Sequence, residues 1–207
     1  MVFMQIVFQF LLILATYFIG SIPTGVWYSQ YKHQQDVRLF GSGNSGATNI
    51  GRTYGFKAAV FVALCDTFKG WIPVAIASYC FNGNALVIGA VALAAVIGHA
   101  YPIFANYKGG KIVATSIGVL LGYQFFIGLF MLFLFVTLLY ITSTVSLSSM
   151  VSYSFTALFI LISQPNKIYG LTFVIIALFM IYRHRENIDR LLNHTEKRIK
   201  FGLNQAR

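Results

Sequence analysis

Long apolar runs without a charge constrain this chain more than any other feature of its sequence. The first run extends from about Phe3 to Tyr28 and contains no Asp, Glu, Lys or Arg. About 20 helical residues cross the roughly 30 Å hydrocarbon core of a bilayer, and further runs of that kind follow along the 207 residues. Only 10% of the residues are charged, whereas a soluble domain carries roughly 25%. The sequence therefore predicts an all-α, polytopic membrane protein that forms one integral membrane domain, residues 1–207.

We expect seven membrane-spanning helices, with the N-terminus outside and the C-terminus in the cytoplasm. This topology places nearly all lysines and arginines on the cytoplasmic side, which is the usual bias of membrane proteins. A basic tail, residues 183–207, is expected as a cytoplasmic amphipathic helix. The alternative is five spans, with residues 112–140 kept as one helix and later segments merged. The seven predicted spans are residues 3–28, 56–81, 85–104, the two parts of 112–140 on either side of a break at 122–124, a span ending near 162, and 168–182.

The formal charge of +10 comes from 15 Lys and Arg against 5 Asp and Glu, and it has two explanations. Basic loops orient membrane proteins and contact anionic lipids, but basic side chains also bind anionic substrates. Nucleic acid is not expected, because no extended basic surface carries interleaved aromatic residues. Cys65 and Cys80 lie in one predicted span, about 22 Å apart along a helix, so we expect two unpaired and buried thiols.

Two glycine-rich segments are the first candidates for a functional site, because irregular backbone at membrane depth is tolerated only inside protein or beside an aqueous cavity. The first glycine segment, residues 41–49, combines glycines such as Gly43, which let backbone approach a ligand, with neutral hydrogen-bonding side chains. Arg52 follows it, and arginine matches phosphate geometry. The alternative is a turn-rich connector. The hydrogen-bonding side chains are those of Ser42, Asn44, Thr48 and Asn49.

The second glycine segment is Lys108-Gly109-Gly110-Lys111, and it precedes a predicted helix that contains Thr115. Backbone N–H groups and the positive end of a helix dipole bind anions. The segment is therefore a candidate phosphate cradle, with Lys111 adding charge. The spacing of a nucleotide P-loop is absent. A basic anchor beside the membrane is the alternative.

Three ionisable residues fall inside the predicted spans. Asp66 and Lys69 are three residues apart, so we expect them to form a salt bridge on one helical face. His99 is expected to be a packing histidine with satisfied hydrogen bonds. All three are interpreted as supporting residues.

Past the last predicted span, His184 and Asn187 share a helical face. Glu186 points elsewhere and is expected to brace an arginine of the polar loops; a solvated helix is the alternative. No serine occupies a G-x-S-x-G motif and neither cysteine has a plausible histidine partner. Four scattered histidines and five acids favour neither a metal nor a cofactor. If the chain is an enzyme, its catalysis depends mainly on positioning and charge stabilisation.

These segments resemble those of the bacterial acyl-phosphate:glycerol-3-phosphate acyltransferases, and the resemblance extends over essentially the whole chain in order. The matching residues are Ser21-Ile22-Pro23-Thr24-Gly25, Gly41-Ser42-Gly43-Asn44, Ala47-Thr48-Asn49, Arg52, Asp66, Lys69-Gly70, Gly98-His99, Pro102, Lys108-Gly109-Gly110-Lys111, Val113-Ala114-Thr115, Ser146-Leu147 and His184-Arg185-Glu186-Asn187-Ile188.

The resemblance implies transfer of a fatty acyl group from acyl phosphate to the 1-hydroxyl of sn-glycerol 3-phosphate, which gives lysophosphatidic acid and phosphate. This reaction is the first step of phospholipid biosynthesis. It also implies a seven-helix fold in the cell membrane, an active site that faces the cytoplasm, contact with membrane lipids, and an acyl-phosphate-producing enzyme as a candidate partner. By positional match the catalytic residues are Ser42, Arg52, Lys111, Ser146, His184 and Asn187, and the phosphate-binding residues are Gly43, Asn44, Thr48, Asn49, Lys108, Gly109, Gly110 and Thr115.

Three positions depart from the family pattern. The family often has glycine after the lysine of the second glycine segment, where this chain has Ile112. It usually has glycine before Thr195-Glu196, where this chain has His194. The family also tends to carry a basic residue before Ser146, where Ser143-Thr144 is neutral.

Because acyl phosphate is already activated, the resemblance favours direct attack of the glycerol hydroxyl on the acyl carbonyl. Either the departing phosphate or His184 accepts the proton. A small transporter of anionic metabolites is the alternative from another class. Transporter sites lie near the bilayer midplane and often occur in paired repeats, whereas the polar segments here gather toward one face of the predicted topology.

Overall fold

The computed structural model describes residues 2–205, and within them all regular structure is helical. This confirms the all-α prediction. Residues 1, 206 and 207, at the ends of the predicted domain and of the predicted tail, lie outside the described residues. The chain divides into two compact units, residues 1–123 and 124–207, and each is described by itself. The single acyltransferase domain stays a prediction.

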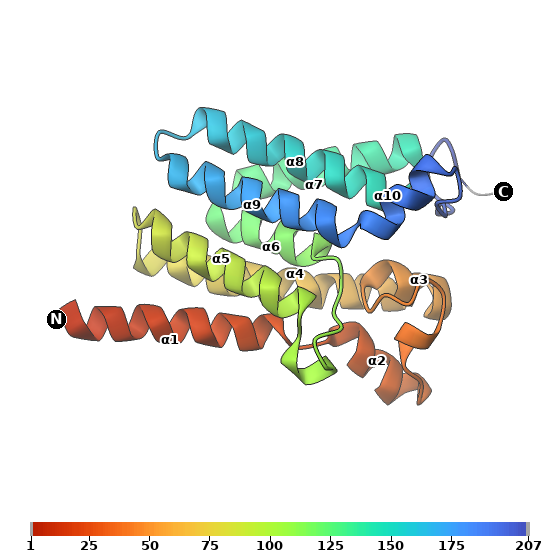
Figure 1. Ribbon diagram of the computed structural model, residues 1–207, viewed down its shortest axis with the longest axis horizontal. Helices are drawn as coiled ribbons and strands as arrows, with labels where there is room; N and C mark the ends of the chain where they lie inside the picture. Colours follow the sequence, from red (N-terminus) through yellow and green to blue (C-terminus); the bar gives the residue numbers. More distant parts are fainter. Residues whose placement is uncertain (1, 206–207) are drawn as a thin grey trace. The chain divides into compact units, whose positions relative to one another are not determined.

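The first unit packs its helices in two close pairs, α4 against α6 and α1 against α5 (Figure 1). Glycines allow the first of these contacts. A Cβ on Gly70 would lie 2.2 Å from the carbonyl oxygen of Thr115, and a Cβ on Gly118 would lie 1.9 Å from that of Thr67. The elements of the unit are α1 (Val2–Gly20), α2 (Thr24–His33), η1 (Val37–Leu39), α3 (Ala47–Tyr54), α4 (Phe56–Cys80), α5 (Ala85–Ala100), η2 (Ile103–Ala105) and α6 (Val113–Tyr123).

The second unit packs α8 (Val145–Ser163) between α7 (Phe125–Thr142) and α9 (Lys167–Arg183), and α10 (Arg185–Leu192) follows α9 after a bend of 60°. A stripe of hydroxyl side chains lies on the buried face of α8. Each hydroxyl donates to a backbone carbonyl four residues earlier, so the polar atoms are satisfied within the helix. The stripe comprises Ser148, Ser152 and Thr156, which donate at 2.9, 2.7 and 2.9 Å.

By length and composition, five helices among the described residues can cross a membrane, or six if α9 and α10 form one broken span. The apolar helix α6 has only 11 residues. The predicted break near residues 122–124 is confirmed, because α6 ends at Tyr123 and α7 begins at Phe125. The alternative of one helix across residues 112–140 is wrong. The count of seven spans and the orientation of the termini stay predictions.

Three predicted boundaries are corrected by the structure. The first predicted span is interrupted between Gly20 and Thr24, since Pro23 lacks an amide proton and disfavours helical backbone at the residue before it. The expected loop at residues 30–55 contains η1, α3 and the end of α2. The expected helix of the tail ends at Leu192, shortly before His194 adopts a left-handed φ of 56°.

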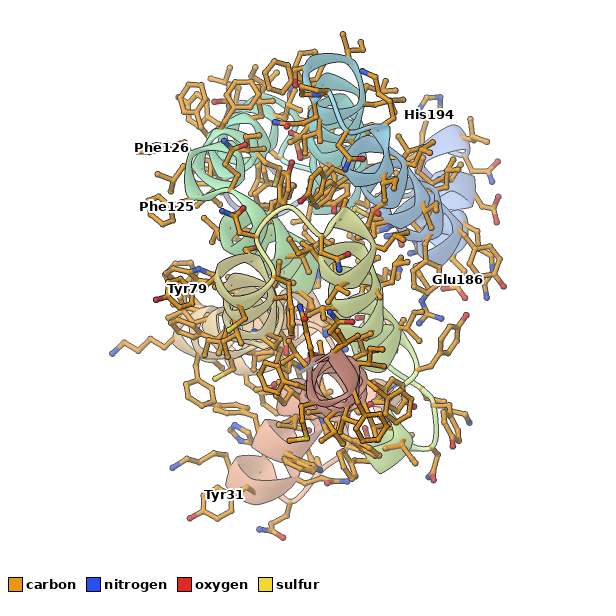
Figure 2. All side chains as sticks on the ribbon, turned by 90° about the vertical axis from the view of Figure 1, so that its left-hand side faces the viewer. Tyr31, Tyr79, Phe125, Phe126, Glu186 and His194 are labelled. Atoms are coloured by element: carbon orange, nitrogen blue, oxygen red, sulfur yellow. The ribbon has the colours of Figure 1, made fainter. Side chains whose placement is uncertain are left out.

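Many large apolar side chains are exposed, as expected for helices whose outer faces contact lipid. Figure 2 shows Tyr79 of α4 and Phe126 of α7 pointing away from the helices that carry them. Cys65 and Cys80 are both unpaired, as predicted. Neither thiol is fully buried, which corrects the prediction: Cys65 is half-buried, and Cys80 is exposed because it shares a helical face with exposed Ile76 one turn earlier.

Candidate active site

The first glycine segment is organised by one buried side chain, that of Asn49. Its Oδ1 accepts the backbone N–H of Ser42 at 2.8 Å. Its Nδ2 donates to the carbonyl oxygens of Val37, Phe40 and Asn44 at 3.1, 2.9 and 2.9 Å. Both ends of the amide are therefore engaged by backbone. The side chain of Asn49 therefore orders the segment, and its contact with substrate stays a prediction.

The other predicted residues of this segment lie nearer the surface. Asn44 is half-buried, and its Oδ1 accepts the N–H of Gly46 at 2.8 Å in a turn just before α3. Ser42 and Gly43 are exposed, and Gly43 has a left-handed φ of 71°. Thr48 is half-buried in the first turn of α3, and Arg52 is exposed in its last turn. The first glycine segment thus exposes the Ser42 hydroxyl and the backbone at Gly43, and the Arg52 guanidinium is exposed a few residues further along the chain.

The second glycine segment lies against the C-terminal end of α5. The N–H groups of Gly109 and Gly110 donate to the carbonyl oxygens of Ala100 and His99, both at 3.2 Å. A Cβ on Gly109 would lie 2.1 Å from the His99 carbonyl oxygen, and one on Gly110 would lie 2.2 Å from His99 Nε2. These two glycines are required for close packing. Their N–H groups bond α5 in this structure, and the phosphate cradle stays a prediction.

The two lysines that flank these glycines differ in exposure. Lys108 is exposed and Lys111 is half-buried. Ile112 follows with a left-handed φ of 58° and a fully buried side chain. A positive φ is rare for a β-branched residue and ordinary for glycine. Lys111 thus enters α6 through a strained turn.

A buried charged cluster lies beside the second glycine segment. Nζ of Lys69 is 2.6 Å from Asp66 Oδ1 and donates to the carbonyl oxygen of Ile22 at 2.6 Å, which confirms the predicted salt bridge. His99 is buried, and its Nδ1 lies 3.0 Å from Thr115 Oγ1 and 3.9 Å from Asp66 Oδ1. Thr115, predicted to bind phosphate, therefore contacts the histidine.

A small cavity of about 10 Å³ adjoins this cluster, which is about the room for one water molecule. Both glycine segments reach it, the first through Ser45 and the second through Gly109. Asp66, Lys69 and His99 also line it. The first unit thus brings its two glycine segments and its buried charges to one place.

The second unit contains a polar cluster centred on Glu196. Its Oε1 accepts the hydroxyl of Ser146 at 2.8 Å and Nδ2 of Asn187 at 2.6 Å. Its Oε2 accepts Nε of Arg190 at 2.7 Å. Burial opposes ionisation, but hydrogen bonds from Arg190, Asn187 and Ser146 outweigh it and hold the pKa of Glu196 below its usual range. Ser146 and Asn187, predicted separately from sequence, are thus brought together by one carboxylate.

Sequence reasoning did not assign Glu196 a role. It selected Glu186, which is exposed and which Figure 2 shows at the outside of α10. The sequence did contain a signal for Glu196, because Thr195-Glu196 belongs to the pattern that carries the family resemblance. The departure at His194 was noted there, but Glu196 itself was given no function. Within the second unit, the carboxylate that holds an arginine is Glu196, whose side chain is 7% exposed.

His184 lies at the bend between α9 and α10 and is 2% exposed. Its Nδ1 is 2.8 Å from the carbonyl oxygen of Met180. A carbonyl only accepts, so Nδ1 carries the proton, and Nε2 of the neutral ring is the basic nitrogen. The carbonyl oxygen of His184 accepts the N–H of Asn187 at 2.8 Å. The ring is therefore held through Nδ1 by the backbone of α9.

These features define a membrane protein that is helical throughout the described residues and holds one buried polar cluster in each of its two units. The family model for glycerol-3-phosphate acyltransferase matches residues 10–194. Glycerol-3-phosphate acyltransferases of Streptococcus pyogenes serotypes M5 (strain Manfredo) and M49 (strain NZ131) are 42% identical over 95% of this chain and 96% of theirs.

Two crystal structures are also similar to the chain. The glycerol 3-phosphate form of PlsY (YgiH), an integral membrane glycerol 3-phosphate acyltransferase, matches with a TM-score of 0.88 at 37% identity, over 92% of this chain and 95% of that one. Its lysophosphatidic acid form matches with a TM-score of 0.85 at 36% identity, over the same shares. The chain belongs to the glycerol-3-phosphate acyltransferase family. Family membership replaces the transporter alternative.

Proposed function

We propose that this protein transfers a fatty acyl group from acyl phosphate to the 1-hydroxyl of sn-glycerol 3-phosphate, as the first step of phospholipid biosynthesis. The observation that carries the proposal is the match, at 37% identity, to a relative whose structures hold glycerol 3-phosphate and lysophosphatidic acid. These are the acceptor and the product of such a transfer.

Direct transfer from an activated donor, without an acyl-enzyme intermediate, is supported by the contacts of Ser146 in the second unit, and the resemblance names acyl phosphate as that donor. A serine nucleophile needs an adjacent base within hydrogen-bond reach. The group that accepts the hydrogen bond of the Ser146 hydroxyl is the carboxylate of Glu196. This carboxylate also binds Arg190, and its pKa is lowered. A carboxylate so stabilised is a weak base. A donor that is already activated requires no acyl-enzyme intermediate.

In the proposed reaction, the glycerol oxygen forms a bond to the acyl carbonyl carbon while the bond from that carbon to the phosphate oxygen breaks. Phosphate leaves with the electron pair. The hydroxyl proton goes either to the departing phosphate or to Nε2 of His184. In the first unit, Arg52 and Lys111 hold phosphate charges, with Ser42 and the backbone at Gly43 beside them.

In the second unit, Ser146, His184 and Asn187 orient the reacting groups. The second glycine segment is held in place by the buried charged cluster of Asp66, Lys69 and His99 beside it. We further propose seven spans in the cell membrane, the N-terminus outside, the site facing the cytoplasm, and an acyl-phosphate-producing enzyme as partner. The positive tail and the basic loops support this orientation through the usual charge bias.

A donor assay tests the proposal. Purified protein is given glycerol 3-phosphate with either palmitoyl phosphate or palmitoyl-CoA, and lysophosphatidic acid and phosphate are measured. We expect both products in equal amounts from palmitoyl phosphate alone, and Lys111→Ala to abolish them while the protein remains folded in detergent. Product from palmitoyl-CoA only, or none from either donor, contradicts the proposal.

The proton acceptor is tested separately with His184→Gln. If His184 Nε2 is the base, the pH–rate profile of kcat loses the limb that reports ionisation of the imidazole. An unchanged profile assigns the proton to the departing phosphate.

A further inference from the structure

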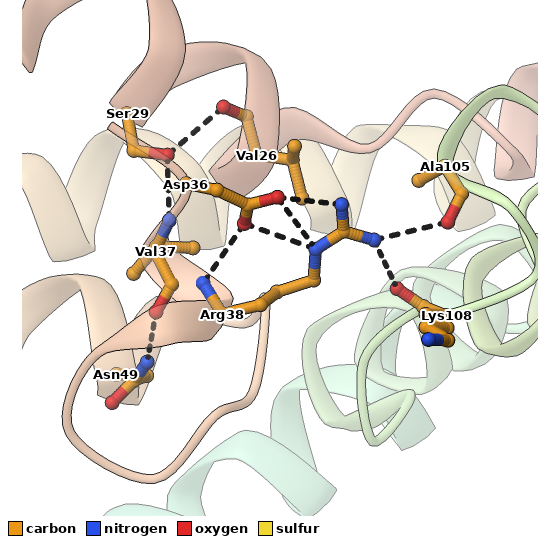
Figure 3. Close-up of polar contacts among 8 residues, drawn as sticks. All are labelled: Val26, Ser29, Asp36, Val37, Arg38, Asn49, Ala105 and Lys108. Carbon is orange, nitrogen blue, oxygen red and sulfur yellow. Dashed lines mark hydrogen bonds and ion pairs between the residues drawn. The ribbon is translucent and has the colours of Figure 1, made fainter. Parts of the chain in front are cut away.

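Arg38 connects the two glycine segments of the first unit (Figure 3). It lies in η1, which follows α2 and precedes the first glycine segment. Asp36 holds its guanidinium: Nε donates to the two carboxylate oxygens at 3.0 and 3.1 Å, and Nη2 donates to Oδ2 at 2.6 Å. The backbone N–H of Arg38 also donates to Asp36 Oδ1, at 2.9 Å. A fork of this kind fixes the plane of the guanidinium.

The third nitrogen of the guanidinium contacts the chain that leads into the second glycine segment. Nη1 donates to the carbonyl oxygens of Ala105 and Lys108 at 3.0 and 3.3 Å. Between these acceptors, Asn106 and Tyr107 have left-handed φ angles of 53° and 58°. Such backbone persists only where its surroundings hold it. Arg38 bonds the carbonyls on both sides of this turn.

The backbone of η1, which carries Arg38, is attached to the first glycine segment. The N–H of Val37 donates to Ser29 Oγ at 3.1 Å, and its carbonyl oxygen accepts from Asn49 Nδ2 at 3.1 Å. Val37 is fully buried. Asn49 in turn holds the N–H of Ser42. One end of η1 is thus fixed to the first segment, while the guanidinium holds the second.

We propose that Asp36 and Arg38 form a clamp that sets the position of the second glycine segment relative to the first, and thereby the affinity for glycerol 3-phosphate. The clamp rests on the proposed function, because its effect is on the binding of that substrate. Arg38 is a positioning residue: its guanidinium donates to a carboxylate and to two backbone carbonyls. Hydrogen bonding from Arg38 also holds the pKa of Asp36 below its usual value, with burial opposing. The pair is therefore charged at neutral pH.

The competing role for Arg38 is attraction of substrate phosphate by charge alone, and Asp36→Asn separates the two. This variant removes a negative charge, so attraction by charge predicts tighter binding and a lower KM for glycerol 3-phosphate. The clamp predicts the opposite, because Arg38 loses the group that orients it. We expect KM to rise about tenfold with kcat changed less than about threefold, the pattern of lost ground-state binding.

Arg38→Lys is the second variant. It keeps the charge but cannot bind a carboxylate with one edge and two carbonyls with another. The clamp predicts a rise in KM for glycerol 3-phosphate of similar size, about tenfold, whereas attraction by charge predicts no change. A KM within about twofold of the unaltered protein in both variants overturns the clamp.

Lys32→Gln is the matched control, because Lys32 is an exposed cation on the preceding helix α2. Its loss should leave KM unchanged. Folding is checked by gel filtration and by Tm, and Asp36→Asn keeps the experiment decisive if an Arg38 variant does not fold.

A second readout separates failure of the clamp from failure of the proposed function. The rise in Tm on adding glycerol 3-phosphate reports binding without turnover. If the unaltered protein transfers no acyl group from acyl phosphate, the proposed donor is wrong, and the Tm shift still tests the clamp. A shift equal in Asp36→Asn and unaltered protein contradicts the clamp whichever donor is used.

Discussion

The hydroxyl of Ser146, in the first turn of α8, donates a 2.8 Å hydrogen bond to Glu196, which lies beyond the end of α10. The same carboxylate binds Asn187 and Arg190 of α10. Glu196 therefore joins the start of one helix to the tail that follows another. We therefore expect Glu196 both to stabilise the second unit and to orient the side chains of Ser146 and Asn187, which are predicted to be catalytic.

Glu196→Gln should lower both stability and activity. The amide still accepts from Ser146 and Asn187, but the charge-assisted bond to Arg190 is lost, and such bonds contribute about 1.5–3 kcal/mol. We expect a lower Tm and a reduced kcat in the acyl transfer assay. Glu186→Gln is the matched control, since Glu186 is an exposed carboxylate of α10, and it should match the unaltered protein. Equal Tm values for the two variants would show that the cluster does not stabilise the second unit.

Stability should depend on pH through the same carboxylate. The pKa of Glu196 is lowered from its ordinary value of 4.5, so the folded protein binds the proton less tightly than the unfolded chain. Its stabilisation is fully present above pH 4.5 and is lost as pH falls through the folded pKa. Thermal unfolding from pH 7 to pH 3 should show a fall in Tm below that point. In Glu196→Gln the fall should be shallower; an identical fall would assign it to other groups.

Alanine substitutions at the two glycines of the second segment should respond differently to removal of the His99 ring. A Cβ on Gly110 meets the His99 ring, whereas a Cβ on Gly109 meets the His99 backbone. Both Gly110→Ala and Gly109→Ala should raise KM for glycerol 3-phosphate, because the segment must move away from α5. Adding His99→Ala removes the ring and should recover part of the loss in Gly110→Ala only. Equal recovery in both backgrounds would contradict the packing seen here.

Glycine substitutions at His194 and Ile112, the two positions where the resemblance expects glycine, should have opposite effects on Tm. His194 is exposed with φ of 56°, and Ile112 is fully buried with φ of 58°. A left-handed non-glycine residue costs roughly 1–2 kcal/mol. His194→Gly relieves this at no loss of packing and should leave Tm equal or raise it. Ile112→Gly loses a buried side chain, which costs at least about 2 kcal/mol, and should lower Tm. A fall in Tm for His194→Gly would show that this strain is negligible.

The helical membrane fold could be predicted because a membrane span is a continuous run of apolar residues, which can be identified from the sequence of that segment alone. The break before Phe125 was visible in Gly122-Tyr123-Gln124, and the salt bridge of Asp66 with Lys69 follows from helical spacing. Each of these depends on residues close in sequence. The interruption at Pro23 was within reach of the same reasoning but was obscured by the apolar residues on either side.

The partners of the polar residues could not be predicted in the same way. Asn49 looked like a ligand-binding amide, and only the fold shows that backbone from residues 37–44 occupies it. Gly109 and Gly110 looked like an anion cradle, yet their N–H groups bond the end of α5.

The sequence by itself determined that the chain is a helical membrane protein of this acyltransferase family, and it marked the short polar segments that interrupt its apolar runs. The tertiary structure alone decided which groups meet: Arg38 with the carbonyls of Ala105 and Lys108, and Glu196 with Ser146. The reason is physical. Burial and helix formation are set by neighbours in sequence, whereas a hydrogen bond between residues fifty or more positions apart exists only once helices have packed and placed donor and acceptor within about 3 Å.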